Sequence, residues 1–359
     1  MAQLVEAQSF DKYLQTSGEA SPAVVEYKEK TNSYLEKIDA ARAFCLTNTE
    51  VPGDSLPGFQ QKYVGKVRDV YRCEGCQILV STDRQSAFDR NLASIPFKGQ
   101  VLNLTSQWWF EQTKDFVPNH VVSTPDPNVV VGKKCTVFPV EFVMRGYMTG
   151  STGTSIWMNY SKGVREYCGH QLPEGLVRNQ KLADNLLTPT TKDDTHDELI
   201  SAAQVVESGR MTQEEWDVCA GYAHALFQFG QTKAAEQGFI LVDTKYEFGK
   251  DSDGNILLID EIHTPDSSRY WISSSYEARI AEGKEPENID KEFLRLWFKE
   301  NCDPYNDPEL LEAPAPLVNE VSRRYIMLYE MITGQEFQFP ADAAAVNQRI
   351  CENLRGLLV

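Results

Sequence analysis

The clearest element that the hydrophobic pattern predicts is a β-hairpin in the second half of the chain. Apolar and polar residues alternate over about 239–248, and a second apolar run covers about 256–262. Asp253-Gly254 lies between the two runs, and this dipeptide is a strong signal for a tight hairpin turn. If these are the two turn residues, Glu247 pairs directly with Asp260. A three-residue turn would shift the register by one residue and undo that pairing.

Charged residues are concentrated on this predicted hairpin. Asp243, Lys245 and Glu247 share one face of the first strand, because a strand alternates its faces. The apolar run 256–259 is too continuous for an exposed strand, yet it ends in Asp260-Glu261. For any one of these residues, a solvated strand face with surface ion pairs is the simpler interpretation. The whole set favours a cation between the carboxylates, and Mg²⁺ is usually held by one or two carboxylates plus phosphate oxygens.

Polar loops supply further candidate binding groups. Thr264–Arg269 contains hydroxyls and a guanidinium, which are groups that hold an anion. Small residues dominate Arg145–Ser155, so its backbone can approach a ligand closely while Arg145 makes a bidentate contact with carboxylate or phosphate. An ordinary flexible loop is the alternative there. In Leu187–Glu198, His196 can titrate near neutral pH or equally cap a helix that starts near Glu198.

A second hairpin is predicted upstream, from about Tyr63 to Asp83, with its turn at Glu74-Gly75. Lys66 and Arg68 share one strand face, and a glycine followed by alternating cations can bind a polyphosphate. An exposed basic strand edge that deters aggregation is the alternative. The Cys73-x-x-Cys76 spacing is more typical of a tight hairpin than of a zinc or redox site. The polar residues 82–89 that follow are predicted to form a loop.

The remaining patterns predict one interrupted strand and several helices. Pro139 interrupts the strand pattern of 135–143, which indicates an edge or a crossing between lobes, where exposed backbone groups can contact an adenine edge. Thr212 and Glu215 form a capping-box pattern, and Gly238 ends the helix that they begin. Apolar residues recur at helical spacing over about 24–44, 101–110, 212–237, 289–298 and 317–332.

Composition narrows the possible partners. The 359 residues carry a formal net charge of -17, which argues against a nucleic-acid or an anionic-membrane surface. No apolar run approaches the ~20 residues that span a bilayer. The N-terminal residues resemble neither a signal peptide nor a transit peptide, although a transit peptide removed beforehand stays possible. The eight cysteines are scattered, which is not a disulfide framework.

Seven sequence blocks occur in an order that resembles one enzyme family. The blocks are GKVRDVY, STDRQSAFD, IPFKGQVLN, VEFVMRGYMTGS, TPTTKDDTHDE, DTKYEFG and LLIDEIHTPDSSRYW. Together they resemble the SAICAR synthetases, the phosphoribosylaminoimidazole-succinocarboxamide synthases of purine biosynthesis, in a long form like that of plants. The similarity runs from about Gly65 to Trp271 and, with the helical tail, covers roughly the last 300 residues. Gln85 and Asp193-Asp194 depart from the usual pattern of the family.

The resemblance implies an α+β fold with two lobes, related to ATP-grasp and kinase-like enzymes. It implies antiparallel sheets with nucleotide between the lobes and a helical C-terminal tail. The expected parts are a helical extension and linker (1–58), a small β-rich nucleotide-binding lobe (59–140) and a larger lobe with the substrate and metal site (141–359). The implied reaction joins L-aspartate to the carboxylate of carboxyaminoimidazole ribonucleotide with ATP. An acyl phosphate fits this chemistry, because a carboxylate is a poor acyl donor until it is activated.

The resemblance also implies roles for individual residues. Glu247 and Asp260 would hold Mg²⁺, and the catalytic residues would be Lys66, Lys245 and Arg269. The residues expected to bind ATP are Lys66, Val67, Arg68, Val137, Glu141 and Lys245. The residues expected to bind the ribonucleotide or aspartate are Arg145, Ser151, Lys192, Asp197, Ser267, Ser268 and Arg269, with His196 as a further candidate.

The expected partners are small molecules only: ATP, the ribonucleotide and L-aspartate. No nucleic acid and no membrane is expected, and the protein is expected to be a monomer or a small homo-oligomer. The expected compartment is the cytoplasm, with the plastid stroma as the alternative. A simple kinase and a nucleotide-binding regulator without turnover are the competing functions. The presence of Lys66, Lys245, Glu247 and Asp260 argues against the regulator.

Overall fold

The computed structural model describes residues 22–88, 90–192, 197–289 and 292–355. The backbone divides into two compact units. Unit 1 comprises Met1–Leu104, Ser123–Val131 and Gly283–Val359, and unit 2 comprises Thr105–Val122 and Gly132–Glu282. These ranges differ from the predicted lobes most clearly in the C-terminal helices, which belong to unit 1. None of the helices within the described residues is both long and apolar enough to cross a membrane.

The main sheet of unit 1 has the strand order β1-β2-β3-β7-β6. Its strands are β1 (Phe59–Val64), β2 (Arg68–Cys73), β3 (Cys76–Ser81), β6 (Val121–Asp126) and β7 (Val129–Lys133). The pairing of Arg72 with Gln77 confirms the hairpin turn at Glu74-Gly75. Cys73 and Cys76 close this hairpin as free thiols.

Two details of the predicted upstream strands are wrong. The strand that was expected to run through Lys66 is interrupted at Gly65, because β1 pairs with β2 and the chain turns between them. The expected loop over 82–89 contains a strand, β4 (Arg84–Ala87), which pairs with β5 (Arg90–Ser94). Arg84 and Gln85 are buried by tertiary contacts, which the polar composition of this segment concealed.

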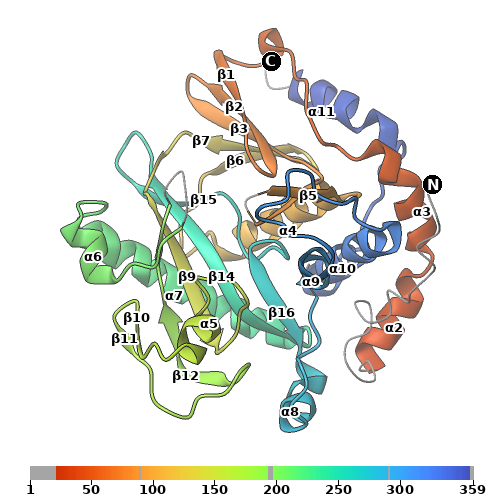
Figure 1. Ribbon diagram of the computed structural model, residues 1–359. Coiled ribbons are helices and arrows are strands. Elements are labelled where there is room, and N and C mark those ends of the chain that lie inside the picture. Colours follow the sequence, from red (N-terminus) through yellow and green to blue (C-terminus); the bar gives the residue numbers. More distant parts are fainter. Residues whose placement is uncertain (1–21, 89, 193–196, 290–291, 356–359) are drawn as a thin grey trace. The chain divides into compact units, whose positions relative to one another are not determined.

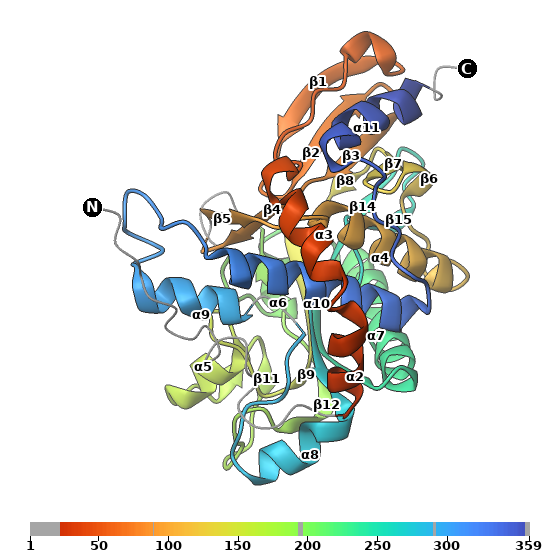
Figure 2. The same ribbon diagram turned by 90° about the vertical axis from the view of Figure 1, so that its right-hand side faces the viewer.

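Helices complete unit 1. They are α2 (Pro22–Thr31), α3 (Tyr34–Ala41), α9 (Glu292–Asn301), α10 (Ala315–Thr333) and α11 (Val346–Arg355), with the short 3-10 turns η1 (Arg42–Phe44), η2 (Gly53–Ser55) and η3 (Ala343–Ala345). The helix α4 (Lys98–Thr113) begins in unit 1 and continues in unit 2 from Thr105. Figure 2 shows α2 and α3 crossing α10, and α11 beside the hairpin of β2 and β3. The predicted helical segments 101–110 and 317–332 are confirmed, and the segment 289–298 is confirmed from Glu292 onward. The pattern over 24–44 divides into α2, α3 and η1. Gly334 ends α10 in the left-handed conformation, with φ 69°.

Unit 2 is built on one long strand, β14 (Phe239–Lys250), which pairs with several neighbours. They are β8 (Thr136–Val137), β9 (Val140–Tyr147), β15 (Ile256–Ile259) and β16 (Ser268–Ile272), and β9 in turn pairs with β12 (Lys181–Leu187) and β13 (Thr190–Thr191). The separate strands β10 (Glu166–Tyr167) and β11 (His170–Gln171) pair with each other. The predicted interruption at Pro139 is confirmed, since it lies between β8 and β9.

Unit 2 also contains further helices, of which α7 packs against β14, β9 and β12. They are α5 (Ile156–Ser161), α6 (Ala202–Glu207), α7 (Gln213–Glu236) and α8 (Ser273–Ala281). Figure 1 shows α7 running beside β14, the contact that buries its apolar stripe. The predicted capping box is confirmed: the Thr212 side chain accepts from the Glu215 N–H, and the Glu215 side chain accepts from the Thr212 N–H. The helix expected near Glu198 begins at Ala202 with Ser201 as its N-cap.

The predicted hairpin of β14 and β15 exists, but its predicted register is wrong by one residue. Glu247 pairs with Ile259 instead of Asp260. The physical reason is Asp251, whose carboxylate accepts from the backbone N–H of Asp253 and Asn255. The Asp251 N–H also donates to the Asn255 carbonyl, which closes a three-residue turn around Asp253.

Candidate active site

Two arginines flank one aspartate across adjacent strands of unit 2. Asp243 on β14 pairs with Arg145 on β9 at one side and with Arg269 on β16 at the other. Asp243 Oδ2 lies 3.7 Å from Arg145 Nη1 and accepts a hydrogen bond from Arg269 Nη1. Asp243 and Arg145 are buried. One carboxylate thus fixes two guanidinium groups side by side, and the pair forms a cationic site suited to phosphate or carboxylate.

The loop after β9 fits closely against these arginines. Arg145 also donates to the Thr188 hydroxyl and to the Thr154 carbonyl, at 2.9 and 3.1 Å. Gly150 has φ +107°, and a Cβ there would lie 2.3 Å from the Ser155 Cβ and 3.6 Å from Arg269 Nη1. Only glycine fits this close approach. Ser151, a predicted ligand-binding residue, follows at once and is partly buried.

Hydroxyl groups line the turn between β15 and β16. Thr264 organises this turn, since its hydroxyl accepts from the N–H of Asp266 and Ser267 and donates to Glu261 Oε2 at 2.5 Å. The Ser268 hydroxyl lies 2.8 Å from the Thr244 hydroxyl on β14. The turn therefore holds the predicted residues Ser267 and Ser268 beside Arg269 and close to the centre of β14.

Lys245, at the centre of β14, is surrounded by carboxylates. Its Nζ lies 2.6 Å from Glu141 Oε2 and 3.8 Å from Asp197 Oδ2. Burial lowers the pKa of Lys245, but the neighbouring carboxylates, Glu141 first, outweigh this effect and raise the pKa above its ordinary value. The Thr190 hydroxyl on β13 also donates to Glu141, at 3.2 Å. Lys245 is therefore a permanent cation next to the first predicted metal ligand, Glu247.

Glu247 is held in an environment that disfavours its charge. Burial first, and then the charge of Asp260, raise the pKa of Glu247 to about 7. Lys192 donates to Glu247 and partly offsets this effect. Although the predicted pairing was wrong, Asp260 influences Glu247 because it leaves β15 in the left-handed conformation, with φ 69°. The charge of Asp260 thus opposes the ionisation of Glu247.

This arrangement fits a hard divalent cation. Mg²⁺ requires only one or two protein carboxylates when phosphate oxygens and water complete its coordination. Within residues 22–88, 90–192, 197–289 and 292–355, no group of three or more His, Cys, Asp or Glu side chains forms a metal cage. Glu247 and Asp260 would supply two carboxylate ligands, with phosphate oxygens and water left to complete the coordination.

The predicted adenine-binding segment lies at the interrupted strand. Val137 on β8 is 41% exposed and pairs with Gly249 on β14. A Cβ at Gly249 would lie 2.9 Å from the Thr136 carbonyl oxygen, so the close approach of these strands requires glycine. The exposed Val137 therefore lies beside β14, the strand that carries Lys245.

The predicted phosphate-binding residues belong to unit 1. Lys66 and Val67 form the tip of the turn between β1 and β2, and Arg68 begins β2. The Gly65 N–H donates to the Arg68 carbonyl at 2.8 Å and closes the turn. His196, the remaining candidate, lies outside the described residues.

The structure also brings in residues that were not predicted as site residues. Asp243, Thr188 and Thr264 hold the predicted ligand-binding side chains in place. Asp243 alternates with Lys245 and Glu247 along the chain, and that spacing was the available signal. Thr188 carried no such signal, because its hydrogen-bond partners lie on β9. The partners of the Thr264 hydroxyl lie within three residues of it, inside the polar loop that the sequence did single out.

Comparison with known proteins agrees with this geometry. The family model described as SAICAR synthetase matches residues 61–310. A phosphoribosylaminoimidazole-succinocarboxamide synthase of Legionella pneumophila is 58% identical over 87% of this chain and 98% of its own. The chloroplastic enzyme of Arabidopsis thaliana is 59% identical over 89% of this chain and 77% of its own. The solved structure "SAICAR-synthase from Saccharomyces cerevisiae complexed SAICAR" has a TM-score of 0.69 and 33% identity, and covers 82% of this chain and 100% of its own. The chain therefore belongs to the SAICAR synthetase family.

Proposed function

We propose that this protein is the ATP-dependent ligase that joins L-aspartate to the carboxylate of carboxyaminoimidazole ribonucleotide, with release of ADP and phosphate. Family membership supports this reaction. The observation that carries it in the structure is the arrangement on β14, where Asp243, Lys245 and Glu247 alternate along one strand. The arginine pair beside Asp243, the ammonium group of Lys245 and the carboxylate of Glu247 therefore follow one another along β14.

Charge and geometry support one order of chemical events. A substrate carboxylate oxygen attacks the γ-phosphorus of ATP, and the bond from that phosphorus to the ADP oxygen breaks. The aspartate amine then attacks the acyl carbon, and phosphate leaves with the former carboxylate oxygen. Such transfers depend on positioning and charge neutralisation rather than on a protein nucleophile. Lys245 is suited to neutralise the transferred group, because its raised pKa keeps it protonated.

We assign the ribonucleotide to the arginine pair. Arg145 and Arg269 present two guanidinium groups that Asp243 holds in fixed positions. Ser151, Ser267 and Ser268 lie near them in the chain and add hydroxyl donors, the usual complement of a phosphate or carboxylate site. Lys192 and Asp197 are assigned to the imidazole or aspartate end of the substrates.

We assign nucleotide binding to the residues that the family resemblance selects. Lys66, Val67 and Arg68 are assigned to the ATP phosphates, Val137 and Glu141 to the adenine, and Lys245 to the phosphates. Glu247 and Asp260 hold Mg²⁺, whose bound charge would neutralise the phosphate oxygens. Lys192 is the residue that must release Glu247 for this purpose, since it donates to that carboxylate in the structure.

The expectations about partners, oligomeric state and compartment stay predictions. They are the absence of nucleic-acid and membrane partners, a monomeric or small homo-oligomeric state, and a cytoplasmic location with the plastid stroma as the alternative. Two relatives, from Arabidopsis thaliana and Vigna aconitifolia, are named as chloroplastic.

The test of the function is the substrate dependence of ADP release. The purified protein is incubated with ATP and MgCl₂, and the ribonucleotide and L-aspartate are omitted in turn. We expect ADP at an enzymatic rate only when both are present. ADP release without aspartate would instead indicate a kinase, and the absence of any ADP would indicate a nucleotide-binding regulator.

A further inference from the structure

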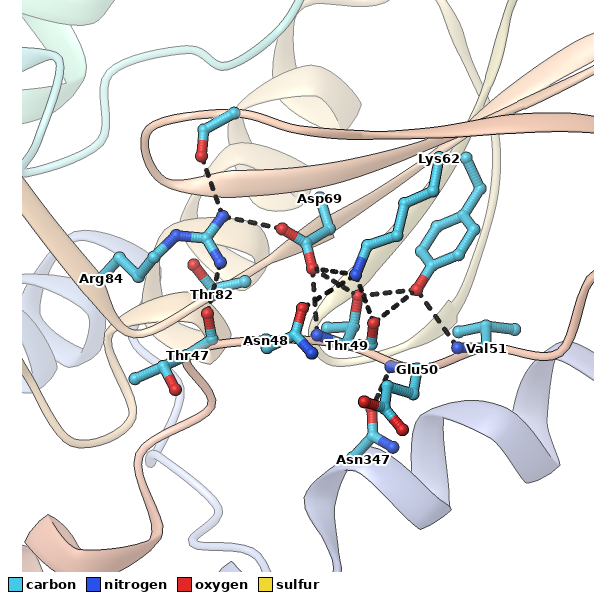
Figure 3. Close-up of polar contacts among 12 residues, drawn as sticks. Thr47, Asn48, Thr49, Glu50, Val51, Lys62, Asp69, Thr82, Arg84 and Asn347 are labelled. Carbon is cyan, nitrogen blue, oxygen red and sulfur yellow. Dashed lines mark hydrogen bonds and ion pairs between the residues drawn. The ribbon is translucent and has the colours of Figure 1, made fainter.

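A buried aspartate lies directly behind the turn that we assign to the ATP phosphates. Asp69 on β2 is fully buried and accepts hydrogen bonds at both carboxylate oxygens. Oδ1 accepts from Arg84 Nη2 at 2.8 Å. Oδ2 accepts from the backbone N–H and the hydroxyl of Thr49, at 3.0 and 2.7 Å, and lies 3.0 Å from Lys62 Nζ. Figure 3 shows Asp69 between Arg84 on one side and Thr49 and Lys62 on the other.

Arg84 connects this carboxylate to the backbone of the turn. Its Nη2 donates to the Gly65 carbonyl at 3.0 Å, and its Nε donates to the Lys66 carbonyl at 3.2 Å. The neighbouring Thr82 donates to the Val67 carbonyl from both its backbone N–H and its hydroxyl, at 3.0 and 2.7 Å. Three consecutive carbonyl groups of the turn therefore point toward the protein interior.

The direction of these carbonyls fixes the direction of the N–H groups. The peptide bonds of the described chain are all trans, and in a trans peptide the N–H points opposite to the C=O of the same plane. The N–H groups of Lys66, Val67 and Arg68 must therefore point away from Arg84 and Thr82. Successive N–H groups that point to one side form a concave anion-binding site suited to phosphate oxygens.

Arg84 can hold this position only because Asp69 compensates its charge. Arg84 is 7% exposed, and a guanidinium at such a depth is costly without a paired carboxylate. Asp69 is fixed in turn by Thr49, which belongs to the segment between the N-terminal helices and β1. The sequence predicted no functional residue in that segment. In the structure, Thr49 binds Asp69, and the Thr47 carbonyl accepts a hydrogen bond from Arg84 Nη1 at 2.5 Å. The segment therefore stabilises the turn through Asp69 and Arg84.

We propose that Asp69 and Arg84 are positioning residues for ATP: supported by Thr49, they hold the carbonyls of Gly65 and Lys66 inward and so present the N–H groups of the turn to the phosphates. This inference rests on the proposed function, specifically on the assignment of Lys66 and Arg68 to the phosphates. It adds a role for the N-terminal segment, because loss of the Thr49 hydroxyl loosens Asp69 and thereby weakens nucleotide binding.

The experiment measures the binding of ADP with MgCl₂, and separately of the ribonucleotide, to the full chain by calorimetry. The variants are Arg84→Lys, which cannot reach both carbonyls, and Thr49→Val, which keeps the shape of Thr49 but removes its hydroxyl. Thr49→Ser restores the hydroxyl and serves as the rescue variant. Asp126→Asn is the matched control, because Asp126 is equally buried and pairs with Arg349 in unit 1 without contacting the turn.

We expect Arg84→Lys and Thr49→Val to weaken ADP binding by about tenfold, which is ~1.4 kcal/mol, and to leave ribonucleotide binding within about twofold. Thr49→Ser and Asp126→Asn should bind both ligands like the wild type. The variant Lys66→Met tests the assignment of the turn to the ATP phosphates separately from the positioning role of Asp69 and Arg84. The positioning role is wrong if Lys66→Met weakens ADP binding while Arg84→Lys and Thr49→Val leave it unchanged. It is also wrong if Arg84→Lys and Thr49→Val weaken the binding of ADP and of the ribonucleotide equally. If Lys66→Met leaves ADP binding unchanged, the phosphate assignment is wrong and the positioning role falls with it.

Discussion

Replacing Glu247 with glutamine should produce a protein that is inactive and yet more stable than the wild type above neutral pH. Glutamine keeps the volume of the side chain and removes its charge. Because Asp260 and burial both disfavour ionised Glu247, the loss of that charge relieves an unfavourable interaction in the metal-free protein. Functional residues often lie in environments that lower the stability of the protein, so replacing them commonly raises stability and reduces activity.

The expected magnitude follows from the pKa. Raising the pKa of this carboxyl from 4.5 to about 7 corresponds to ~3 kcal/mol, since a tenfold change in ionisation is ~1.4 kcal/mol. The folded-state pKa lies above the unfolded value, so the stability contributed by the protonated carboxyl is complete below about pH 4.5. It is lost as the pH rises through about 7. The advantage of Glu247→Gln should therefore be near its maximum at pH 8 and small at pH 4.5.

The assay is urea unfolding in EDTA at pH 5 and pH 8, combined with the rate of ADP formation. Glu174→Gln is the control, because Glu174 is 79% exposed and pairs only at the surface with Arg165. MgCl₂ should stabilise the wild type and not Glu247→Gln, since a ligand that binds only the folded state raises its stability. A Glu247→Gln protein that is no more stable at pH 8, or that gains equally at pH 5, would refute the reasoning. Near wild-type turnover would refute the metal assignment.

Three further predictions concern the arginine pair, its loop and the supporting helix. Arg269→Ala should raise the KM of the ribonucleotide by about tenfold or more while the KM of ATP changes little, because Arg269 supplies half of the guanidinium pair; equal effects on both KM values would assign Arg269 to the nucleotide. Gly150→Ala should destabilise the protein by ~1–3 kcal/mol in urea unfolding, because of its positive φ and the contact with Ser155; an unchanged midpoint would contradict this. Thr212→Ala should cost ~1 kcal/mol of stability without altering kcat, since it removes only a helix cap; a lower kcat with unchanged stability would be the opposite result.

Local sequence signals predicted the elements better than their connections. The hairpin of β14 and β15 was evident from its apolar runs, but the Asp253-Gly254 signal made the turn one residue shorter than it is. Asp251 decides the register, because its carboxylate accepts two backbone N–H groups inside the turn. An aspartate directly before a turn is common, so its presence did not distinguish a three-residue turn from a two-residue turn.

Long-range hydrogen bonds explain the parts of the site that the sequence did not predict. Arg84 was assigned to a polar loop, yet it is buried by bonds to carbonyls about twenty and forty residues earlier in the chain. Thr49 was assigned to a linker because the segment around it is rich in polar residues, Pro and Gly. The local composition shows that Arg84 and Thr49 are polar, but it does not show that they are buried. Their burial depends on hydrogen-bond partners that only the folded chain brings together.

The transfer of an oxygen atom from the ribonucleotide to phosphate tests whether ATP activates the substrate carboxylate. The ribonucleotide is labelled with ¹⁸O in its carboxylate and incubated with the protein, ATP, MgCl₂ and L-aspartate, and the inorganic phosphate is analysed by mass spectrometry. We expect one ¹⁸O atom in each phosphate released, because the attacking carboxylate oxygen leaves with the phosphate. Unlabelled phosphate would contradict activation of the carboxylate, and with it the proposed role of the residues along β14.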